Sequence, residues 1–400
     1  MRNTLIQFGG GNIGRSFIGQ LFSRSGYDVV FIDINEALIA ALNRHNQYRL
    51  IIKRNNAPDE TVWIQHVRAV NGNDHKRVAD EIANATILAT SVGKSALPHI
   101  LPVLAQGLIR RKERLGEVPI DLIIAENIHN GAAYIRQALR PLLPPDYDLS
   151  GLVGLVETSI GKMVPIMKHE DLRQDPVWVF AEPYNRLILD KHGFKNPLPK
   201  IEELAPVENI AAYVDRKLFI HNLGHAAAAY LGYHHSPQSS FLYEVLAVPE
   251  VYRKTRHSME QSAVALNKTY PDDLTLPALH DHIDDLLKRF QNRSLGDTVY
   301  RVGRDLHRKL GKDDRLIGAM LLAKKHGCPC DTIAEAVIAA CEFRAADEEG
   351  NLFPDDSTFA QQEHPQGLEH ILTHVCRLSR DEPLEADVMN EILNNDRDFT

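Results

Sequence analysis

The chain has 400 residues, of which 44% are hydrophobic and 24% charged. At roughly 150 residues per domain, this length favours two or three domains. The net charge of -8, from 53 acidic and 45 basic side chains, argues against a general nucleic-acid binder, which would carry a basic excess. No apolar run reaches the roughly 18 residues of a membrane span, so no membrane partner is expected.

The first half of the chain alternates short apolar runs with helical patterns. The apolar runs predict buried parallel strands at Thr4–Phe8, Val29–Ile32, Thr86–Thr90 and Leu122–Ala125. Helices are predicted between them at Ile13–Ser25, Glu36–His45 and Ser95–Arg114. Further short strands are expected at Leu152–Val156, Trp178–Ala181 and Arg186–Leu189, followed by a Pro-rich hinge at Asn196–Pro206. Alternating strands and helices predict a doubly wound sheet.

Beyond Val207 the pattern is almost entirely helical. Helices are expected at Glu208–Leu231, Ser240–Leu266 with a kink at Pro249, Pro277–Phe290, Thr298–Lys309, Arg315–His326 and Thr332–Ala346. We therefore predict an α/β N-terminal domain over residues 1–200, followed by an all-helical C-terminal domain over residues 201–400.

The cysteines and histidines give no metal-site signal. The four cysteines, Cys328, Cys330, Cys341 and Cys376, lack the two-residue spacing of zinc or redox pairs. The histidines show no ligand spacing either, so we expect reduced thiols and no metal. The apolar run at Thr4–Phe8 is too short for a signal-peptide core, which favours the cytoplasm. Nothing in the pattern predicts self-association, and a monomer is the default.

A glycine-rich turn follows the first predicted strand. Gly9, Gly11 and Gly14 occupy the three positions of the Gly-x-Gly-x-x-Gly fingerprint, within Gly9-Gly10-Gly11-Asn12-Ile13-Gly14. In such a fingerprint the glycines permit a tight turn, close approach of a pyrophosphate and close packing of helix on strand. The phosphates lie at the helix N-terminus, where free N–H groups favour an anion. The pattern predicts a Rossmann-type dinucleotide site; a glycine turn without a ligand is the alternative.

Two further elements belong to the predicted dinucleotide site. Asp33 ends the next predicted strand, near the spacing at which an acid binds the ribose hydroxyls. Because its carboxylate would repel a 2′-phosphate, NAD is expected rather than NADP. Ser91 and Val92, in the turn after a third strand, are also cofactor-binding candidates, although Ser91 equally suits an ordinary helix cap.

The helix predicted over Glu208–Leu231 carries Lys217, Asn222 and His225. At about 100° per residue, Asn222 lies about 140° and His225 about 80° from Lys217. One broad face of the helix can therefore present an amine, an amide and an imidazole together. The alternative is a lysine in solvent, with Asn222 and His225 making local hydrogen bonds.

A cationic cluster lies in the helix predicted over Thr298–Lys309: Arg301, Arg304, Arg308 and Lys309. The spacing of three and four residues puts the three arginines on one helix face. Arginine makes bidentate contacts with phosphate, so the cluster favours a phosphorylated substrate. The alternative is a solvated basic face paired with neighbouring aspartates.

Lys217, Asn222 and His225 reproduce the Lys-x4-Asn-x2-His pattern of the polyol-specific long-chain dehydrogenases. The resemblance continues, in order, over residues 1–345. It includes Gln7–Arg15, Ala125–Asn127, Arg289–Asn292, Tyr300–Arg304, Arg308–Leu310 and Asp314–Ile317. Within the family, the chain most resembles the members that act on mannitol 1-phosphate.

The resemblance implies a Rossmann-type N-terminal domain, a helical C-terminal domain, an active site between them, and NAD-dependent oxidation without a catalytic metal. It implies that Lys217 is the general acid/base. Asn222 and Asn127 would donate hydrogen bonds to the developing alkoxide, and His225 would position the substrate. Arg301 and the following Lys309 resemble residues that bind substrate hydroxyls.

The chain departs from the family pattern near the end of the first domain. The family's Asp-Arg-x-x-Pro element is here Gly161-Lys162-Met163-Val164-Pro165, which lacks the substrate-side carboxylate. Arg293 and Glu182-Pro183-Tyr184-Asn185 also differ. We expect interconversion of mannitol 1-phosphate and fructose 6-phosphate. The alternatives are another polyol, a hexuronate, or a non-catalytic NAD-binding regulator.

Overall fold

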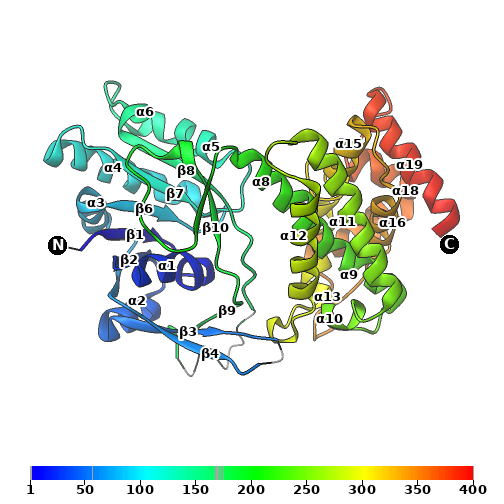
Figure 1. Cartoon of the computed structure of the whole chain (residues 1–400), viewed down its shortest axis with the longest axis horizontal. Coiled ribbons are helices and arrows are strands. Elements are labelled where there is room, and N and C mark those ends of the chain that lie inside the picture. The colour runs from blue at the N-terminus through cyan, green and yellow to red at the C-terminus, as the bar shows by residue number, and fades with distance from the viewer. Residues whose placement is uncertain are drawn as a thin grey trace. The chain divides into compact units, whose positions relative to one another are not determined.

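The apolar runs of the first half of the chain form one eight-stranded sheet in the computed structural model of the protein (Figure 1). Its strands are β1 (Thr4–Phe8), β2 (Asp28–Asp33), β5 (Val67–Asn71), β6 (Ile87–Thr90), β7 (Ile120–Ile124), β8 (Val153–Ser159), β10 (Leu187–Asp190) and β11 (Leu204–Val207). The strand order is β11-β10-β8-β7-β6-β1-β2-β5. Every neighbouring pair is parallel except β8 and β10, which are antiparallel.

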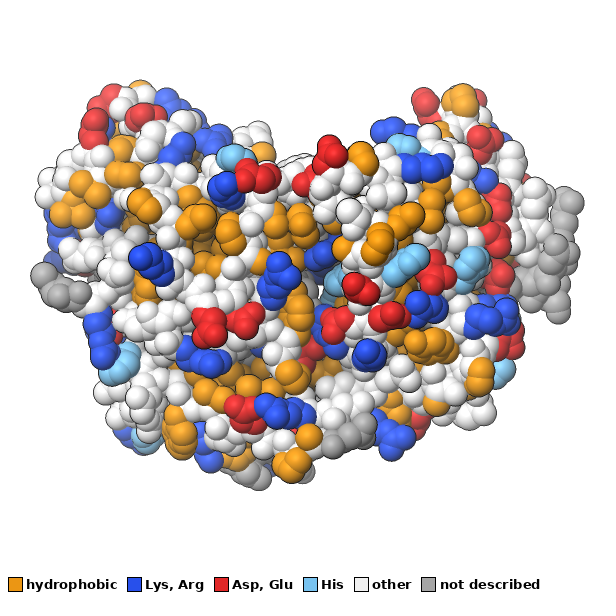
Figure 2. Space-filling model, in the orientation of Figure 1, with side chains coloured by type: hydrophobic (Ala, Val, Ile, Leu, Met, Phe, Trp, Pro, Cys, Tyr) orange, Lys and Arg blue, Asp and Glu red, His pale blue; other side chains and the backbone are white. Residues whose placement is uncertain are grey.

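The structure describes residues 2–55, 57–165, 167, 171, 173 and 175–399, without the side chains of 397–399. The chain divides into two compact units, residues 1–210 and 211–400. Within the described residues, no helix is long and apolar enough to cross a membrane. On the face shown in Figure 2, the coloured Lys and Arg side chains of each unit are interspersed with Asp and Glu, without a continuous basic patch.

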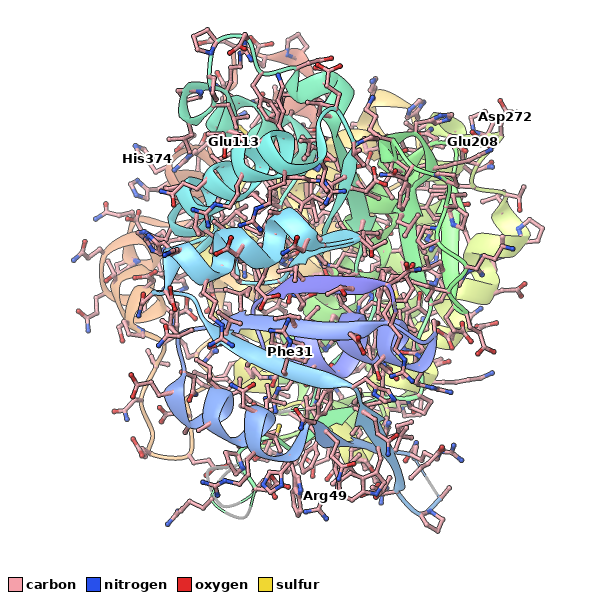
Figure 3. The ribbon with its side chains drawn as sticks, turned by 90° about the vertical axis from the view of Figure 1, so that its left-hand side faces the viewer. Phe31, Arg49, Glu113, Glu208, Asp272 and His374 are labelled. Atoms are coloured by element: carbon pink, nitrogen blue, oxygen red, sulfur yellow. The ribbon has the colours of Figure 1, made fainter. Side chains whose placement is uncertain are left out.

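Alternating residues of the central strands supply two separate cores, one on each face of the sheet. Leu5 and Phe31 belong to one core, and their neighbours Ile6 and Val30 to the other. The first core is covered by α1 (Gln20–Arg24), α2 (Glu36–His45) and a small sheet, and the second by α3 (His75–Asn84), α4 (Leu97–Leu115) and α5 (Gly131–Leu139). Figure 3 shows Phe31 in the strand layer, between the cyan helices on one side and the blue α2 on the other.

The small sheet has the order β4-β3-β9, and only its β9 strand was expected from the sequence, at Trp178–Ala181. It consists of β3 (Gln47–Ile52), β4 (Glu60–Gln65) and β9 (Val179–Ala181). Strand β5 and helix α3 were also not anticipated. The strands and helices that were predicted in this unit are present, and the Rossmann-type sheet is confirmed. Leu204–Val207, at the end of the segment expected to be the hinge, forms β11 and pairs with β10.

Residues 211–399 form helices, as predicted, and the described part of this unit contains no strand longer than an isolated bridge. The helices are α8 (Ile210–Arg216), α9 (Leu223–His235), α10 (Leu242–Val245), α11 (Pro249–Thr269), α12 (Leu276–Phe290), α13 (Val299–Gly303), α14 (Leu306–Lys309), α15 (Ile317–Lys325), α16 (Asp331–Cys341), α17 (Pro354–Thr358), α18 (Leu368–His370) and α19 (Pro383–Phe399). Helix α9 is rich in alanine and buried along most of its length, between α11, α16 and α13. Small side chains allow these helices to approach it closely.

Two predicted helices are interrupted. Pro249 begins α11 instead of kinking a longer helix. The prediction of a single helix over Thr298–Lys309 is wrong. The helix is interrupted between α13 and α14 at Asp305, whose φ is +76°. Asp356 accepts hydrogen bonds from the backbone N–H groups of Asp305 (3.0 Å) and Leu306 (2.7 Å). A buried carboxylate 51 residues away in sequence therefore stabilises the break, which local periodicity cannot reveal.

Candidate active site

The glycine turn after β1 has the geometry that its sequence predicts. Gly9 has φ +88°, and its N–H donates to the carbonyl of Ile32 (2.8 Å). A Cβ on Gly14 would lie 1.9 Å from the carbonyl oxygen of Gly9, so only glycine allows this close packing. A Cβ on Gly11 would meet nothing within 4 Å. The turn is therefore tight on its inner side and open at Gly11, where a pyrophosphate needs close access to the backbone.

Asp33 lies beside this turn at the end of β2. Its Oδ2 accepts a hydrogen bond from the N–H of Gly10 (2.7 Å), and its Oδ1 accepts one from the N–H of Asn35 (2.9 Å). Each carboxylate oxygen has two lone pairs, so these bonds leave acceptor capacity for ribose hydroxyls. The glycine turn and Asp33 together fit a dinucleotide.

The predicted turn residues Ser91 and Val92 lie at the point where the strand order reverses. The chain runs from β1 outward through β2 and β5, and then returns to place β6 on the other side of β1. The N–H of Ser91 donates to the carbonyl of Phe8 (2.9 Å), and the Gln7 side chain donates to the Ser91 hydroxyl (2.9 Å). Open α/β sheets bind ligands at such switch points.

Glu126 holds the turn that contains Ser91 and Val92, a function that sequence reasoning missed. Its two carboxylate oxygens accept hydrogen bonds from the N–H groups of Val92 and Gly93, each at 2.8 Å. Burial raises the pKa of Glu126, and the two donors partly oppose that shift. Asn127, the predicted alkoxide ligand, is the next residue and is exposed. The family-like Ala125-Glu126-Asn127 motif was a signal for Glu126 that we did not use.

Arg15 is a second residue that the sequence analysis left without a role. It is buried, and its guanidinium donates to the carbonyls of Gly10 (2.6 Å) and Val177 (2.7 Å). Burial lowers the pKa of Arg15. By donating a hydrogen bond to the Gly10 carbonyl, the guanidinium stabilises the glycine turn and adds positive charge beside the predicted phosphate site.

In the second unit, a π-helical turn contains the predicted base. The helix that begins at Ile210 continues to His235 but has a π-helical turn over Lys217–Asn222. Because a π turn bonds residue i to residue i+5, Asn222 lies one turn after Lys217. Lys217 and Asn222 are therefore closer to the same face than α-helical spacing predicted. π turns are frequent at functional sites.

Lys217 is partly buried, and its pKa is lowered to about 8. Burial is the main cause, because an ammonium loses hydration, and Arg315 lowers the pKa further while Asp314 opposes it. Arg315 is 8% exposed and donates from Nε to Asp314 Oδ1 (2.6 Å). It was part of a family-like segment, but the sequence analysis gave it no function.

His225 is held between an aromatic ring and a carboxylate. Its ring stacks on Phe290, with centroids 4.8 Å apart and an interplanar angle of 19°. Its Nε2 lies 3.1 Å from Oδ2 of Asp297, which also forms an ion pair with Arg301. Burial lowers the pKa of His225 well below its usual value, and Arg301 and other cations lower it further. The imidazole is therefore neutral at neutral pH.

The three arginines predicted to share one helix face do not lie on one continuous helix, because the break at Asp305 separates Arg301 and Arg304 from Arg308. Arg301 pairs with Asp297. Arg304 lies over the rings of Tyr300 and Phe353. Lys309 is buried and donates to the carbonyl of Val302 (2.6 Å). Arg308 is exposed and pairs with Asp305 and Asp314. For this residue, the structure agrees with the alternative prediction of a solvated basic face paired with aspartates.

The two departures from the family pattern in the first unit contact each other. Lys162 is 7% exposed and donates to the carbonyl of Tyr184 (2.8 Å) and to the side chain of Asn185 (3.0 Å). The N–H of Met163 donates to the buried carboxylate of Glu182. Hydrogen bonds therefore join segments 161–163 and 182–185.

Among the residues that the structure describes, no group of three or more His, Cys, Asp or Glu side chains is placed to hold a metal ion. The four cysteines are buried free thiols. The first unit contains a glycine turn and Asp33 that fit a dinucleotide. The second unit contains the amine of Lys217, the amide of Asn222 and the imidazole of His225. This is the set of groups that the sequence analysis expects of a nicotinamide-dependent oxidoreductase.

Comparison with known proteins identifies the family. Residues 3–203 match the mannitol dehydrogenase Rossmann domain, and residues 209–380 match the mannitol dehydrogenase C-terminal domain. The chain belongs to the mannitol dehydrogenase family and is a dehydrogenase that uses a nicotinamide cofactor. The expected fold and enzyme class are thus confirmed.

Relatives match over nearly the whole chain. The mannitol-1-phosphate 5-dehydrogenase of Shouchella clausii is 32% identical over 389 residues, which are 96% of this chain and 99% of the relative. The enzyme of the same name from Bacillus licheniformis is 33% identical over 390 residues, 97% of this chain and 99% of the relative.

Two solved structures share the fold. Pseudomonas fluorescens mannitol 2-dehydrogenase, in a ternary complex with NAD and D-mannitol, has a TM-score of 0.75 at 16% identity and covers 100% of this chain and 92% of its own. A substrate-free D-sorbitol dehydrogenase has a TM-score of 0.77 at 14% identity and covers 100% of this chain and 94% of its own.

Replacing Gly11 by alanine tests the cradle without disturbing the fold. A methyl group on Gly11 meets nothing within 4 Å, so we expect an unchanged thermal midpoint for Gly11→Ala. The methyl would enter the space needed by the pyrophosphate and weaken NADH binding by about tenfold or more, as measured by fluorescence titration. Gly14→Ala, in contrast, should lower both the thermal midpoint and the affinity. An unchanged NADH Kd in Gly11→Ala would show that the phosphates bind elsewhere.

Proposed function

We propose that the protein interconverts a polyol phosphate and a ketose phosphate with NAD, and that the pair is mannitol 1-phosphate and fructose 6-phosphate. The observation that carries the proposal is the position of Lys217, a partly buried amine on the π turn that also contains Asn222; burial lowers its pKa to about 8, so it can exchange a proton near neutral pH. Asn222 lies one helical turn away. The names of the relatives, at 31 to 33% identity, support the choice of substrate.

Each proposed catalytic group has one task. When bound, the nicotinamide supplies the acceptor or donor of the hydride. In the oxidation direction, the neutral amine of Lys217 takes the proton of the reacting hydroxyl as the C–H hydride leaves and the C=O bond forms. In the reverse direction, the ammonium of Lys217 returns the proton to the carbonyl oxygen. The amides of Asn222 and Asn127 donate hydrogen bonds to the oxygen while it carries negative charge, which stabilises the transition state.

The cofactor in this proposal is NAD rather than NADP. The Asp33 carboxylate accepts from the N–H of Gly10 and so stands beside the glycine turn. A second negative charge on a ribose 2′-phosphate would be repelled there, whereas free ribose hydroxyls can donate to the carboxylate. Catalysis is proposed to need no metal, since a lysine amine can carry the proton by itself.

The substrate's distal end is assigned to the cationic residues of the second unit. Arg301 and Lys309 are proposed to bind substrate hydroxyls, and Arg304 and Arg308 to bind the phosphate. Lys309 donates hydrogen bonds to the carbonyls of Val302 and Arg304, which fix its position, and burial, followed by Arg315, lowers its pKa well below the usual lysine value. Guanidinium groups make bidentate contacts with phosphate oxygens.

A second candidate is oxidation of a different polyol or of a hexuronate. It is favoured by Gly161 and Lys162, which stand where the family commonly has Asp-Arg. Gly161 offers no carboxylate to the substrate. Lys162 donates hydrogen bonds to the Tyr184 carbonyl and to the Asn185 side chain. The base and the cofactor site are the same in both candidates.

Fructose 6-phosphate and fructose, offered separately with NADH, distinguish these candidates. We expect rapid NADH oxidation with fructose 6-phosphate and at least about 100-fold lower kcat/KM with fructose, because the phosphate contributes charge-assisted hydrogen bonds. Equal efficiency with both sugars would refute the phosphate site. Reaction with neither, but with a hexuronate, would favour the second candidate.

Lys217→Ala should lower kcat by about 100- to 10,000-fold, the range for loss of a general acid/base. NADH affinity should stay within about twofold, because the dinucleotide cradle lies in the first unit. Lys254→Ala is the matched control: this lysine is also in the helical unit, but it pairs with Glu250 and Glu335 on α11 and α16. Near-normal turnover in Lys217→Ala would refute its assignment as the base.

The pH dependence of kcat/KM should have opposite signs for oxidation of the polyol and for reduction of the ketose. Oxidation needs neutral Lys217, so its kcat/KM should rise with pH and level off above about 8. Reduction needs the ammonium, so its kcat/KM should be constant below about 8 and fall about tenfold per pH unit above it. Steady-state rates from pH 6 to 10 with saturating cofactor would show the break. A break near the ordinary lysine pKa would mean that Lys217 is hydrated in the working enzyme.

A further inference from the structure

Asp297 connects two residues that the proposed function places at the substrate. Its Oδ2 lies 3.1 Å from Nε2 of His225 on α9, and its other oxygen forms an ion pair with Arg301 on α13. The carboxylate is 4% exposed. No sequence signal singled it out, because it lies outside the Lys-x4-Asn-x2-His pattern and 72 residues from His225.

The backbone around Asp297 holds the carboxylate in place. The Asp297 carbonyl accepts a hydrogen bond from the N–H of Leu242 (2.9 Å), at the start of α10. The next residue, Thr298, forms a bridge with Phe241 and caps α13 through its side chain. The carboxylate therefore stands on a segment that is held by backbone contacts at Asp297 and at Thr298.

The hydrogen bond to Asp297 decides which nitrogen of His225 carries the proton. An ionised carboxylate can only accept hydrogen bonds, so Nε2 must be the donor. In a neutral imidazole the other nitrogen, Nδ1, is then an acceptor. Among the described residues, no group forms a hydrogen bond with Nδ1 of His225, so its lone pair is available to a ligand hydroxyl.

Burial, and after it the surrounding cations, lower the pKa of His225 and keep the imidazole neutral despite its carboxylate partner. Arg301 compensates the negative charge of Asp297, so that charge does little to protonate His225. The other charged or titratable groups near the ring come from several elements: Arg289 of α12, Lys309 of α14, Arg315, and His221 of the π turn. All of them disfavour a second proton on His225.

We propose that Asp297 is a positioning residue that fixes His225 as the Nε2–H tautomer, so that Nδ1 accepts a hydrogen bond from a substrate hydroxyl, and that it orients Arg301 toward the same substrate. This inference rests on the proposed polyol substrate. It makes His225 an acceptor, which selects a hydroxyl rather than a carbonyl or an anion at its position. One buried carboxylate thus aligns one acceptor and one donor on two different helices.

The tautomer is measurable without turnover. In protein labelled with [15N]histidine, two-bond 1H–15N correlations distinguish Nε2–H from Nδ1–H imidazoles, and His225→Gln identifies the signal. We expect wild-type His225 to be neutral Nε2–H from pH 6 to 9. In Asp297→Asn, the signal should move to Nδ1–H or to a mixture of tautomers. A wild-type Nδ1–H or doubly protonated ring, or an unchanged tautomer in Asp297→Asn, would overturn the proposal.

The kinetic test separates positioning from catalysis. Asp297→Asn should raise KM for the ketose phosphate and lower kcat/KM by about 10- to 100-fold, the size of a lost charge-assisted hydrogen bond. NADH affinity and the break near pH 8 should stay unchanged, because Lys217 is intact. Loss of kcat alone, with KM unchanged, would contradict a positioning role.

Asp121→Asn is the matched control for removal of a buried carboxylate. Asp121 is 3% exposed in the first unit and accepts hydrogen bonds from the N–H groups of Lys195 and Asn196. Its replacement should lower stability but leave the His225 tautomer and the sugar KM unchanged. If the wild-type enzyme proves inactive on fructose 6-phosphate, the proposed substrate fails, while the tautomer measurement still decides the role of Asp297.

Discussion

Burial of the helical run Ile210–His235 is the constraint on which the site depends. Its α9 portion, which carries His225, lies among three other helices, and the π turn that carries Lys217 and Asn222 packs against α11 and α12. The same burial removes water from the Lys217 ammonium and lowers its pKa to about 8. Packing therefore both positions the amine and lowers its pKa toward neutral pH, as the proposed role of general acid/base requires. A surface lysine on the same helix would have neither property.

Irregular backbone at the site is stabilised by buried charged side chains from distant parts of the sequence. Arg15 bonds the carbonyl of Gly10, Glu126 bonds the N–H groups of Val92 and Gly93, and Asp356 bonds the N–H groups at the break before α14. Regular helices and strands satisfy their own backbone groups, but turns that approach a ligand do not. A buried charged group needs several hydrogen-bond partners, and Arg15, Glu126 and Asp356 each have at least two.

The two segments that differ from the expected family pattern, 161–163 and 182–185, lie together in the first unit. Segments 161–163 and 182–185 contact each other through Lys162 and Glu182, so a substitution in one segment alters the environment of the other. Neither segment includes the amine, the glycine turn or Asp33. In the proposed function, the residues that would set substrate choice are therefore separate from those that would carry out hydride transfer.

The sequence by itself determined the Rossmann-type sheet, the glycine turn, Asp33 and the helix of Lys217, because each depends on local periodicity or on residues within about 20 positions. It did not reveal the π turn at Lys217–Asn222, the break at Asp305 or the partners of Arg15, Glu126 and Asp297. Those features depend on contacts between residues far apart in the chain. The four cations near residue 305 illustrate the difference. Helical spacing placed the three arginines on one face of a single helix, but a carboxylate from α17 stabilises a left-handed residue that divides this helix in two. Only tertiary structure decides such cases, because the energy that holds the break comes from outside the local segment.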